Sequence, residues 1–354
     1  MEQKAPRLAV IMPAYNAGQY IEKAVCSILK QSFRDLRLIV VDDGSTDDTA
    51  QILRRLREQD ARLMPISVPN GGPAKARNRG LDAVEPGTEY VMFADADDEL
   101  LPDAVEYAMA GAEGADMVFF GFTIVSPSGS CRRYSEPEQR LDRSRLGSAF
   151  GRLYKANLFN QVWGKLFRME LIGSTHRFPD YRWGEDRLFI FRCLDEADSV
   201  KILPECKYRY IMHPGESLIT RFCQDKPRVC LESDAVVQQL CASLGCDEAT
   251  EADCRYMFAK SIFSCMTTLF SPNCPLDAGE KAAYVRSIIN DPQVRRRCRD
   301  VFGGAVPNIL CSVVCSGQVW LNMAVFRMLV LAGRISPGRE AHGARRGDGH
   351  GPGQ

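Results

Sequence analysis

The sequence has no excess of charge of either sign: 45 lysines and arginines balance 45 aspartates and glutamates in 354 residues. Nucleic-acid-binding proteins usually carry a strong basic field, so this balance argues against a nucleic-acid partner. Apolar residues make up 45% of the chain and charged residues 25%, an ordinary globular composition that argues against a purely structural or disordered protein. The length favours one large domain with a smaller attachment.

Closely paired cysteines are also missing. The 14 cysteines are scattered from Cys26 to Cys315, and no two of them form a Cys-x-x-Cys pair. Small disulfide-dependent domains are much shorter than this chain. We therefore expect reduced cysteines, most of them in the core, rather than a disulfide framework.

Long apolar runs are absent as well. The first seven residues lead into an apolar run at residues 8–12 that is too short for the apolar region of a signal peptide, so we expect a cytoplasmic protein. Residues 304–335 are apolar-rich but interrupted, and fall short of the roughly 20 apolar residues of a membrane span. We expect a docked helix there or, because Arg295, Arg296, Arg297 and Arg299 precede it, a peripheral contact with the inner face of the cell membrane.

The sequence does contain a repeated alternation of apolar runs and amphipathic stretches. Short apolar runs predict buried parallel strands, and they lie at residues 8–12, 38–41, 63–68 and 90–94. Apolar residues at helical spacing predict helices over residues 21–29 and after Asp47. Strands that alternate with helices predict an α/β fold with a doubly wound, mainly parallel, Rossmann-like sheet.

The remainder of the chain divides by composition. Residues 116–125 predict another strand, residues 126–145 read as a loop, and residues 200–212 predict two short strands on either side of Pro204. Residues 230–298 read mostly as helix. We therefore expect an α/β domain over residues 1–215, a helical C-terminal region over residues 216–335, and a disordered tail over residues 336–354.

Polar residues follow each predicted strand, at the edge of the sheet where doubly wound folds bind ligands. Asp42 and Asp43 end an apolar strand, which costs stability unless they are hydrogen-bonded or face a polar ligand. Asp95 and Asp97 flank Ala96 and suit a divalent cation that also takes pyrophosphate oxygens. Helix capping and solvated turns are the alternative interpretation of both pairs.

Together these loops resemble the family 2 glycosyltransferases, which carry P-x-Y-N, D-D-G-S-x-D, a glycine-rich segment with A-R-N, and D-x-D in this order. Gly184-Glu185-Asp186 stands where the family has G-E-D, and Trp163-Gly164-Lys165-Leu166-Phe167 resembles a segment of its bacterial members. The resemblance covers about residues 8–215. The matching loop residues are Pro13-Ala14-Tyr15-Asn16, residues 42–47, residues 70–78 and Asp95-Ala96-Asp97-Asp98.

The resemblance implies a GT-A fold and a metal-assisted, inverting transfer of a sugar from a nucleotide-diphosphate donor, most commonly a UDP-sugar. It places Asp43 at the nucleobase and Arg77 at the base or the phosphates. Asp95 and Asp97 would hold Mn²⁺ or Mg²⁺ against the diphosphate, and His213 is a further candidate ligand, with a plain loop histidine as the alternative. The expected donor-binding residues are Pro13, Tyr15, Asn16, Asp43, Gly72, Arg77, Asp95 and Ala96.

The resemblance also implies an acceptor, either a glycan or a lipid-linked glycan of the cell envelope. Asp186 is the expected general base for the acceptor hydroxyl, a role that Glu185 could share. An acidic start of a helix is the structural alternative for this pair. Trp163, Lys165 and Trp183 are expected on the acceptor side, with a core or rim position as the alternative for Trp163.

Other activities fit the sequence less well. The first strand is followed by Pro13-Ala14-Tyr15-Asn16 rather than G-x-G-x-x-G, which argues against a dinucleotide-dependent oxidoreductase. A sugar-nucleotide-synthesising nucleotidyltransferase would open with a glycine-rich loop bearing Arg or Lys, which is absent. A catalytically silent sugar-nucleotide-binding partner subunit should have lost the metal pair or the acidic pair. Both pairs are present, so the sequence predicts an enzyme.

Overall fold

The computed structural model describes residues 5–213, 222–299, 301 and 305–332. The chain divides into two compact units. The first contains Met1–Leu153, Asn157–Gly215 and Arg228–Glu251, and the second contains Tyr154–Ala156, Glu216–Pro227 and Ala252–Gln354. The sequence prediction separates the chain at residue 215, so the two divisions differ mainly in the stretch Arg228–Glu251. The tail predicted for residues 336–354 lies outside the described residues.

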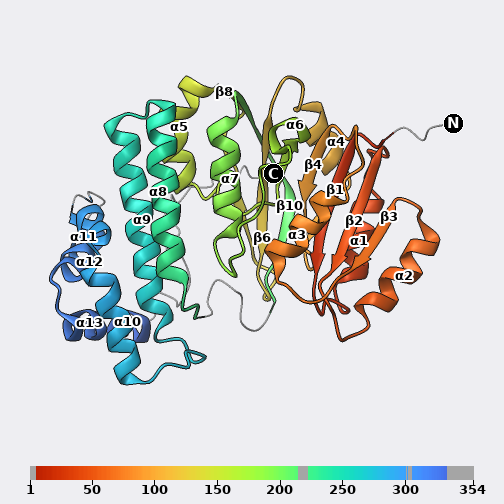
Figure 1. Cartoon of the computed structure of the whole chain (residues 1–354). Helices are drawn as coiled ribbons and strands as arrows, with labels where there is room; N and C mark the ends of the chain where they lie inside the picture. Colours follow the sequence, from red (N-terminus) through yellow and green to blue (C-terminus); the bar gives the residue numbers. More distant parts are fainter. Residues whose placement is uncertain (1–4, 214–221, 300, 302–304, 333–354) are drawn as a thin grey trace, which may run out of the picture. The chain divides into compact units, whose positions relative to one another are not determined.

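Ten strands in the described part of the first unit form one sheet (Figure 1). Their order is β3-β2-β1-β4-β9-β6-β10-β5, with β7 beside β6 and β8 beside β10. β1 to β4 run parallel, as do β6 and β10, and the other pairings are antiparallel. This confirms the predicted α/β fold with a mainly parallel central sheet. The strands are β1 (Leu8–Ala14), β2 (Leu36–Asp42), β3 (Leu63–Ser67), β4 (Tyr90–Phe93), β5 (Glu99–Leu100), β6 (Met117–Val125), β7 (Cys131–Tyr134), β8 (Gln139–Asp142), β9 (Lys165–Arg168) and β10 (Ser199–Ile211).

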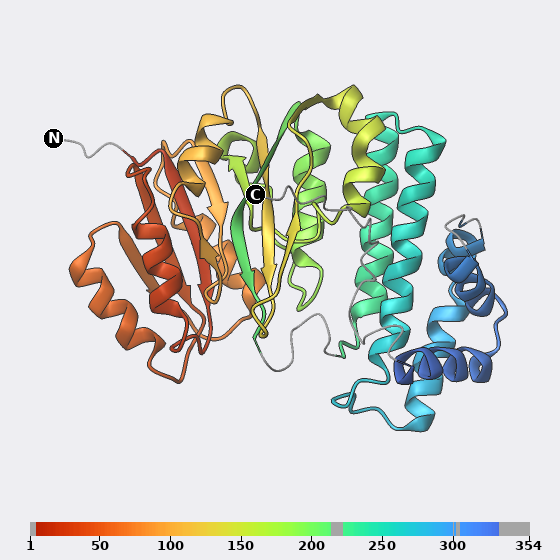
Figure 2. The ribbon, with the colours of Figure 1, turned by 180° about the vertical axis from the view of Figure 1, so that it is seen from behind.

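Helices cover both faces of this sheet, because alternate residues of a strand point to opposite sides. Leu8 and Val10 of β1 belong to the core cluster that contains the apolar residues of α1 and α4. On the other face, a Cβ added to Gly80 of α3 would lie 2.4 Å from Cγ2 of Ile11, so glycine permits this close approach. Figure 1 and Figure 2 show the two faces. The helices are α1 (Ile21–Leu29), α2 (Thr49–Gln59), α3 (Pro73–Asp82), α4 (Ala104–Ala110), α5 (Arg143–Lys155), α6 (Met169–Ile172) and α7 (Glu185–Glu196).

Two local predictions are wrong. Residues 126–145, expected as a loop, contain β7, β8 and the start of α5. β7 pairs with β6 and β8 pairs with β10, so distant strands supply hydrogen bonds that the local polar composition does not reveal. The two short strands expected around Pro204 are one strand, β10. Its pairing with β6 shifts register between Leu203 and Cys206, and such a bulge accommodates a proline without a backbone N–H.

The C-terminal part is helical, as predicted for residues 230–298. None of the helices in the described residues combines the length and apolarity needed to cross a membrane. All 14 cysteines lie in the described residues, none of them is in a disulfide, and many are buried. The remaining helices are α8 (Lys226–Leu244), α9 (Glu248–Thr268), α10 (Ala278–Asn290), α11 (Pro292–Arg299), α12 (Ala305–Cys315) and α13 (Val319–Leu331).

Candidate active site

The loops that follow β1 to β4 lie at one edge of the sheet, because these strands are parallel neighbours. The loop after β1 is joined to the loop after β2. Oδ1 of Asn16 accepts a hydrogen bond from the backbone N–H of Thr46 at 2.8 Å, and the N–H of Asn16 donates to Oγ of Ser45 at 2.9 Å. Asn16 has a φ of 48°, a left-handed conformation that asparagine tolerates. Tyr15 next to it is exposed.

Asp43 shapes the glycine-rich loop after β3. Its carboxylate is buried, and its two oxygens accept hydrogen bonds from the N–H groups of Gly71 at 2.8 Å and Gly72 at 2.7 Å. Gly72 has a φ of 90°, which favours glycine, and it caps α3 at the point where Pro73 begins the helix. If Asp43 contacts a nucleobase as predicted, the same carboxylate has to bind both the base and the N–H groups of this loop.

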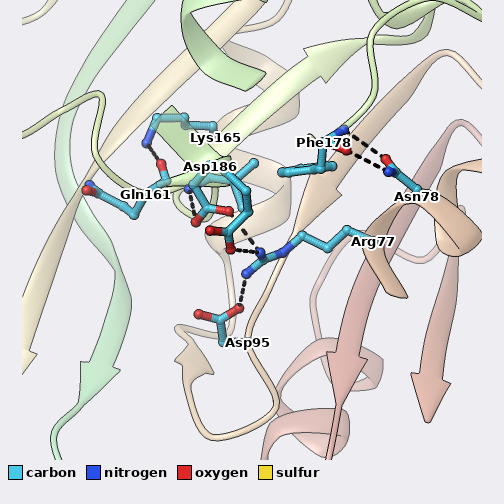
Figure 3. A network of polar contacts seen from close by, with 9 residues as sticks. Arg77, Asn78, Asp95, Gln161, Lys165, Phe178 and Asp186 are labelled. Carbon is cyan, nitrogen blue, oxygen red and sulfur yellow. Dashed lines mark hydrogen bonds and ion pairs between the residues drawn. The ribbon is translucent and has the colours of Figure 1, made fainter. Parts of the chain in front are cut away.

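The guanidinium of Arg77 in α3 binds three carboxylates, one from the loop after β4 and two from the start of α7 (Figure 3). Its Nη2 donates to Oδ1 of Asp95 at 3.0 Å, and its Nη1 donates to Oε1 of Glu185 at 3.0 Å and to Oδ1 of Asp186 at 2.8 Å. The side chain is only 5% exposed. Burial by itself would lower the pKa of Arg77, but the three carboxylates raise it. Arg77 is therefore a permanent cation that links Asp95 of the predicted metal pair to both members of the predicted acidic pair.

Asp186 lies in the first turn of α7, whose N-cap residue, Gly184, has a φ of 81°. Its Oδ2 accepts a hydrogen bond from the N–H of Val162 at 3.2 Å, on the side opposite Arg77. Burial, together with the charges of Glu185 and Asp95, raises the pKa of Asp186 to about 7, although Arg77 and the Val162 N–H act in the opposite direction. A carboxylate with such a pKa is matched to proton transfer near neutral pH.

Asp97 and His213 approach each other near the end of β10. Nε2 of His213 lies 3.8 Å from Oδ2 of Asp97, is buried, and has no hydrogen-bond partner within the described residues. The His213 ring stacks on Tyr20 with the centroids 4.0 Å apart. Burial, and next the charge of Asp95, raise the pKa of Asp97 to about 6. These observations suit a cation between Asp97 and His213.

A complete protein-only metal site is absent from the described residues, since they include no group of three or more His, Cys, Asp or Glu side chains placed to hold an ion. Mg²⁺ and similar ions are often held by one or two carboxylates, with phosphates and water completing the shell. The pair Asp97 and His213, with Asp95 adjacent, fits that incomplete type of site.

Asp98 and Tyr208, which were not among the predicted site residues, support this loop. The buried carboxylate of Asp98 accepts hydrogen bonds from the Tyr208 hydroxyl at 2.8 Å and from the N–H of Ile211 at 2.9 Å. The same Tyr208 oxygen accepts the N–H of Asp95 at 3.1 Å. The position of Asp98 directly after Asp97 was a usable signal, whereas nothing in the sequence connects Tyr208 with this loop.

The residues expected on the acceptor side occupy different environments. Trp163 is buried and stacks on Tyr208 with the ring centroids 4.4 Å apart. Lys165 is 2% exposed, and its amine donates to the carbonyl oxygens of Gln161 and Trp163. This burial argues against the predicted direct contact of Trp163 and Lys165 with an acceptor. Trp183 is half-buried, with the Arg187 guanidinium carbon 5.2 Å from its ring centroid.

Comparison with known proteins places this site in a family. The model of glycosyl transferase family 2 matches residues 9–174. The chain is 38% identical over 255 residues to the GalNAc(5)-diNAcBac-PP-undecaprenol beta-1,3-glucosyltransferase of Campylobacter jejuni, with 67% of this chain and 80% of that protein covered. It is 30% identical over 216 residues to the uncharacterized glycosyltransferase EpsJ of Bacillus subtilis, with 59% of this chain and 62% of EpsJ covered.

Solved structures share the fold. S. aureus TarS 1-349 in complex with UDP-GlcNAc has a TM-score of 0.66 at 21% identity, with 92% of each chain covered. The mannosyltransferase PcManGT from Pyrobaculum calidifontis, in complex with GDP-Man and Mn²⁺, has a TM-score of 0.50 at 17% identity, with 93% of this chain and 86% of that chain covered. At these identities the likeness shows the fold alone. The family match and the Campylobacter relative, together with the GT-A architecture, show that the chain belongs to the family 2 glycosyltransferases.

Proposed function

We propose that the protein transfers a sugar, with inversion, from a nucleotide-diphosphate donor to a hydroxyl of a glycan or lipid-linked acceptor, with Asp186 as the general base. The observation that carries the proposal is the placement of Asp186. Its carboxylate is held between the Arg77 guanidinium and the Val162 N–H, and its pKa is raised to about 7. Glu185 is buried and bound to Arg77, which favours Asp186 as the base and Glu185 as a support.

In the proposed reaction the acceptor oxygen attacks the anomeric carbon of the donor from the face opposite the leaving group. The new carbon–oxygen bond forms as the bond to the diphosphate breaks, and the hydroxyl proton passes to a carboxylate oxygen of Asp186. The nucleoside diphosphate carries away the electron pair. Arg77 favours the ionised form of Asp186 and orients its carboxylate, because the guanidinium remains a cation throughout.

The donor is proposed to bind over the loops after β1 to β4. Tyr15 and Asn16, the Asp43–Gly72 turn, and Ala96 would line its nucleotide side. A UDP-sugar is the favoured donor, since TarS was solved with UDP-GlcNAc, while PcManGT with GDP-Man represents the alternative. Pro13, which lies opposite Val41 in the β1–β2 pairing, would position the first of these loops.

Mn²⁺ or Mg²⁺ is the proposed cofactor. Asp97 and His213 would hold the ion, with Asp95 beside them, and the ion would neutralise the negative charge that develops on the leaving diphosphate. The unpartnered Nε2 of His213, 3.8 Å from Asp97, supports this assignment.

A cytoplasmic location with peripheral contact at the inner face of the cell membrane is also proposed. One face of α13 exposes apolar side chains, with Trp320 68%, Met328 61% and Leu331 77% exposed. The only charged residue of this helix is Arg327, and the helix contains no acidic residue that anionic lipid would repel. An exposed apolar face with a tryptophan and an arginine suits an interfacial helix.

A thermal-shift series tests the donor site first. UDP-, GDP-, CMP- and dTDP-sugars are added with and without Mn²⁺, since a ligand that binds the native state raises its melting temperature. We expect stabilisation by one nucleotide class, enhanced by Mn²⁺. Stabilisation by none would contradict the donor site. Donor binding with no transfer to any glycan or lipid-linked acceptor would favour the alternative of a catalytically silent sugar-nucleotide-binding subunit.

A further inference from the structure

Lys165 carries a buried amine that has no direct role in the proposed reaction. Its side chain is 2% exposed. Its Nζ lies 2.5 Å from the carbonyl oxygen of Gln161, 3.2 Å from that of Trp163, and 5.1 Å from the centre of the Phe119 ring. Burying an amine in an apolar core is costly, and these contacts compensate only in part. Its hydrogen bonds fix the backbone of residues 161–163.

One peptide unit connects Lys165 to Asp186. The carbonyl of Gln161 and the N–H of Val162 belong to the same planar peptide group. Because this peptide is trans, its C=O and N–H bonds point in opposite directions. The Lys165 amine donates a hydrogen bond to the Gln161 carbonyl oxygen, and the Val162 N–H donates to Oδ2 of Asp186 at 3.2 Å. Figure 3 shows Lys165, Gln161 and Asp186 next to one another, with Arg77 on the other side of Asp186.

We infer that Lys165 is a positioning residue for the general base: it orients and polarises the Gln161–Val162 peptide, whose N–H stabilises the ionised carboxylate of Asp186. This inference rests on the proposed function, because it assigns Lys165 a role through the base of that reaction. Hydrogen bonds in a chain polarise one another, so a cation at one end strengthens the donor at the other. The Asp186 carboxylate is thus held by Arg77 on Oδ1 and by the Lys165-bound peptide on Oδ2.

The charges that face Asp186 set the direction of the effect. Arg77 of α3 and the protonated form of Lys165 of β9 favour the carboxylate, whereas Glu185 of α7 and Asp95 after β4 oppose it. Burial lowers the pKa of Lys165 to about 7, and the charge of Asp186 acts against that lowering. By reciprocity, a protonated Lys165 favours ionised Asp186. Loss of the amine should therefore raise the pKa of the base.

The test is the pH profile of kcat/KM for the 354-residue chain with the proposed UDP-sugar donor. We expect K165M to move the acidic limb of the profile to higher pH by about one unit, with activity recovering at alkaline pH. K226M is the matched control, because Lys226 is equally buried and donates to the Ser264 hydroxyl, far in sequence from the base. K226M should lose stability while its profile stays at the wild-type position.

The outcomes separate this inference from the proposed function. If D186N is inactive but the pH profile of K165M is not shifted, the role of Lys165 is overturned and Asp186 remains the base. Transfer retained by D186N would overturn the proposed function itself. If K165M does not fold, K165Q keeps a hydrogen-bond donor and removes the charge, so the same upward shift is expected, and an unshifted K165Q profile would also overturn the inference.

Discussion

Replacement of Arg77 by methionine tests how much the guanidinium of this residue contributes to the stability of the fold. The guanidinium makes hydrogen bonds of 2.8 to 3.0 Å to Asp95, Glu185 and Asp186, and its side chain is 5% exposed. In R77M the three carboxylates would lie together without a counter-charge. Removal of one partner from a buried charge cluster costs about 3–5 kcal/mol. Since about 1 kcal/mol corresponds to roughly 2–4 °C for a unit of this size, the melting temperature should fall by on the order of 10 °C.

The same variant gives a signed pH dependence. Arg77 lowers the pKa of Asp186, so without Arg77 this pKa rises further, and near neutral pH the folded state binds more protons than the unfolded state. Stability relative to the wild type should then recover as the pH falls from 8 toward 5. Thermal melts at several pH values measure this recovery, and activity assays are not needed.

The matched control is R7M. Arg7 pairs with Glu89 at 2.9 Å, but both side chains are close to half exposed, and such a surface pair contributes at most about 1 kcal/mol. A loss in R77M no larger than that in R7M, or one that does not change with pH, would refute the reasoning that the buried Arg77 guanidinium compensates the three carboxylates around it.

Three further predictions follow from the site and from α13. Because the pKa of Asp186 is raised to about 7 and the base must be ionised, kcat/KM of the wild type should fall about tenfold per pH unit below pH 7, and a flat pH profile would contradict this assignment. D186N should lose about 10²–10⁴-fold in rate while it keeps the donor-induced thermal shift. D97A should abolish the part of the donor-induced thermal shift that depends on Mn²⁺. In the wild type this Mn²⁺-dependent part should weaken below about pH 6, because Asp97 becomes protonated. An unchanged Mn²⁺ effect in D97A would exclude Asp97 as a ligand. The triple variant W320S/M328S/L331S should float less with vesicles that contain anionic lipid, and flotation equal to that of the wild type would remove the basis for the proposed membrane contact.

The order of elements and the residues at the strand ends could be predicted from the sequence. Apolar runs and helical spacing are local properties, so the strand over residues 8–12 and the helix over residues 21–29 are recovered as β1 and α1. Parallel strands end at the same edge of a sheet, so the loops that carry Asn16, Asp43 and Asp95 had to lie near one another.

Tertiary structure decided which partners these residues have. Arg77 and Asp186 are 109 positions apart, and only the docking of α7 next to α3 brings them within 2.8 Å. A sequence gives no sign that one guanidinium joins Asp95 to the acidic pair, because these contacts depend on side-chain geometry across α3, α7 and the loop after β4. The expectation that Arg77 faces the donor phosphates did not include this role.

The acceptor side shows the same limit. Trp163 and Lys165 stand in a motif that indicated function, but burial is a property of the folded chain, and both side chains are enclosed. Similarly, the pairing of β7 with β6 and of β8 with β10 forms strands within residues 126–145, which were expected as a loop. The sequence alone determined the family, the strand-end motifs and their chemistry. Long-range packing decided the charge partners of the base, because burial and hydrogen bonding depend on residues far apart in the chain.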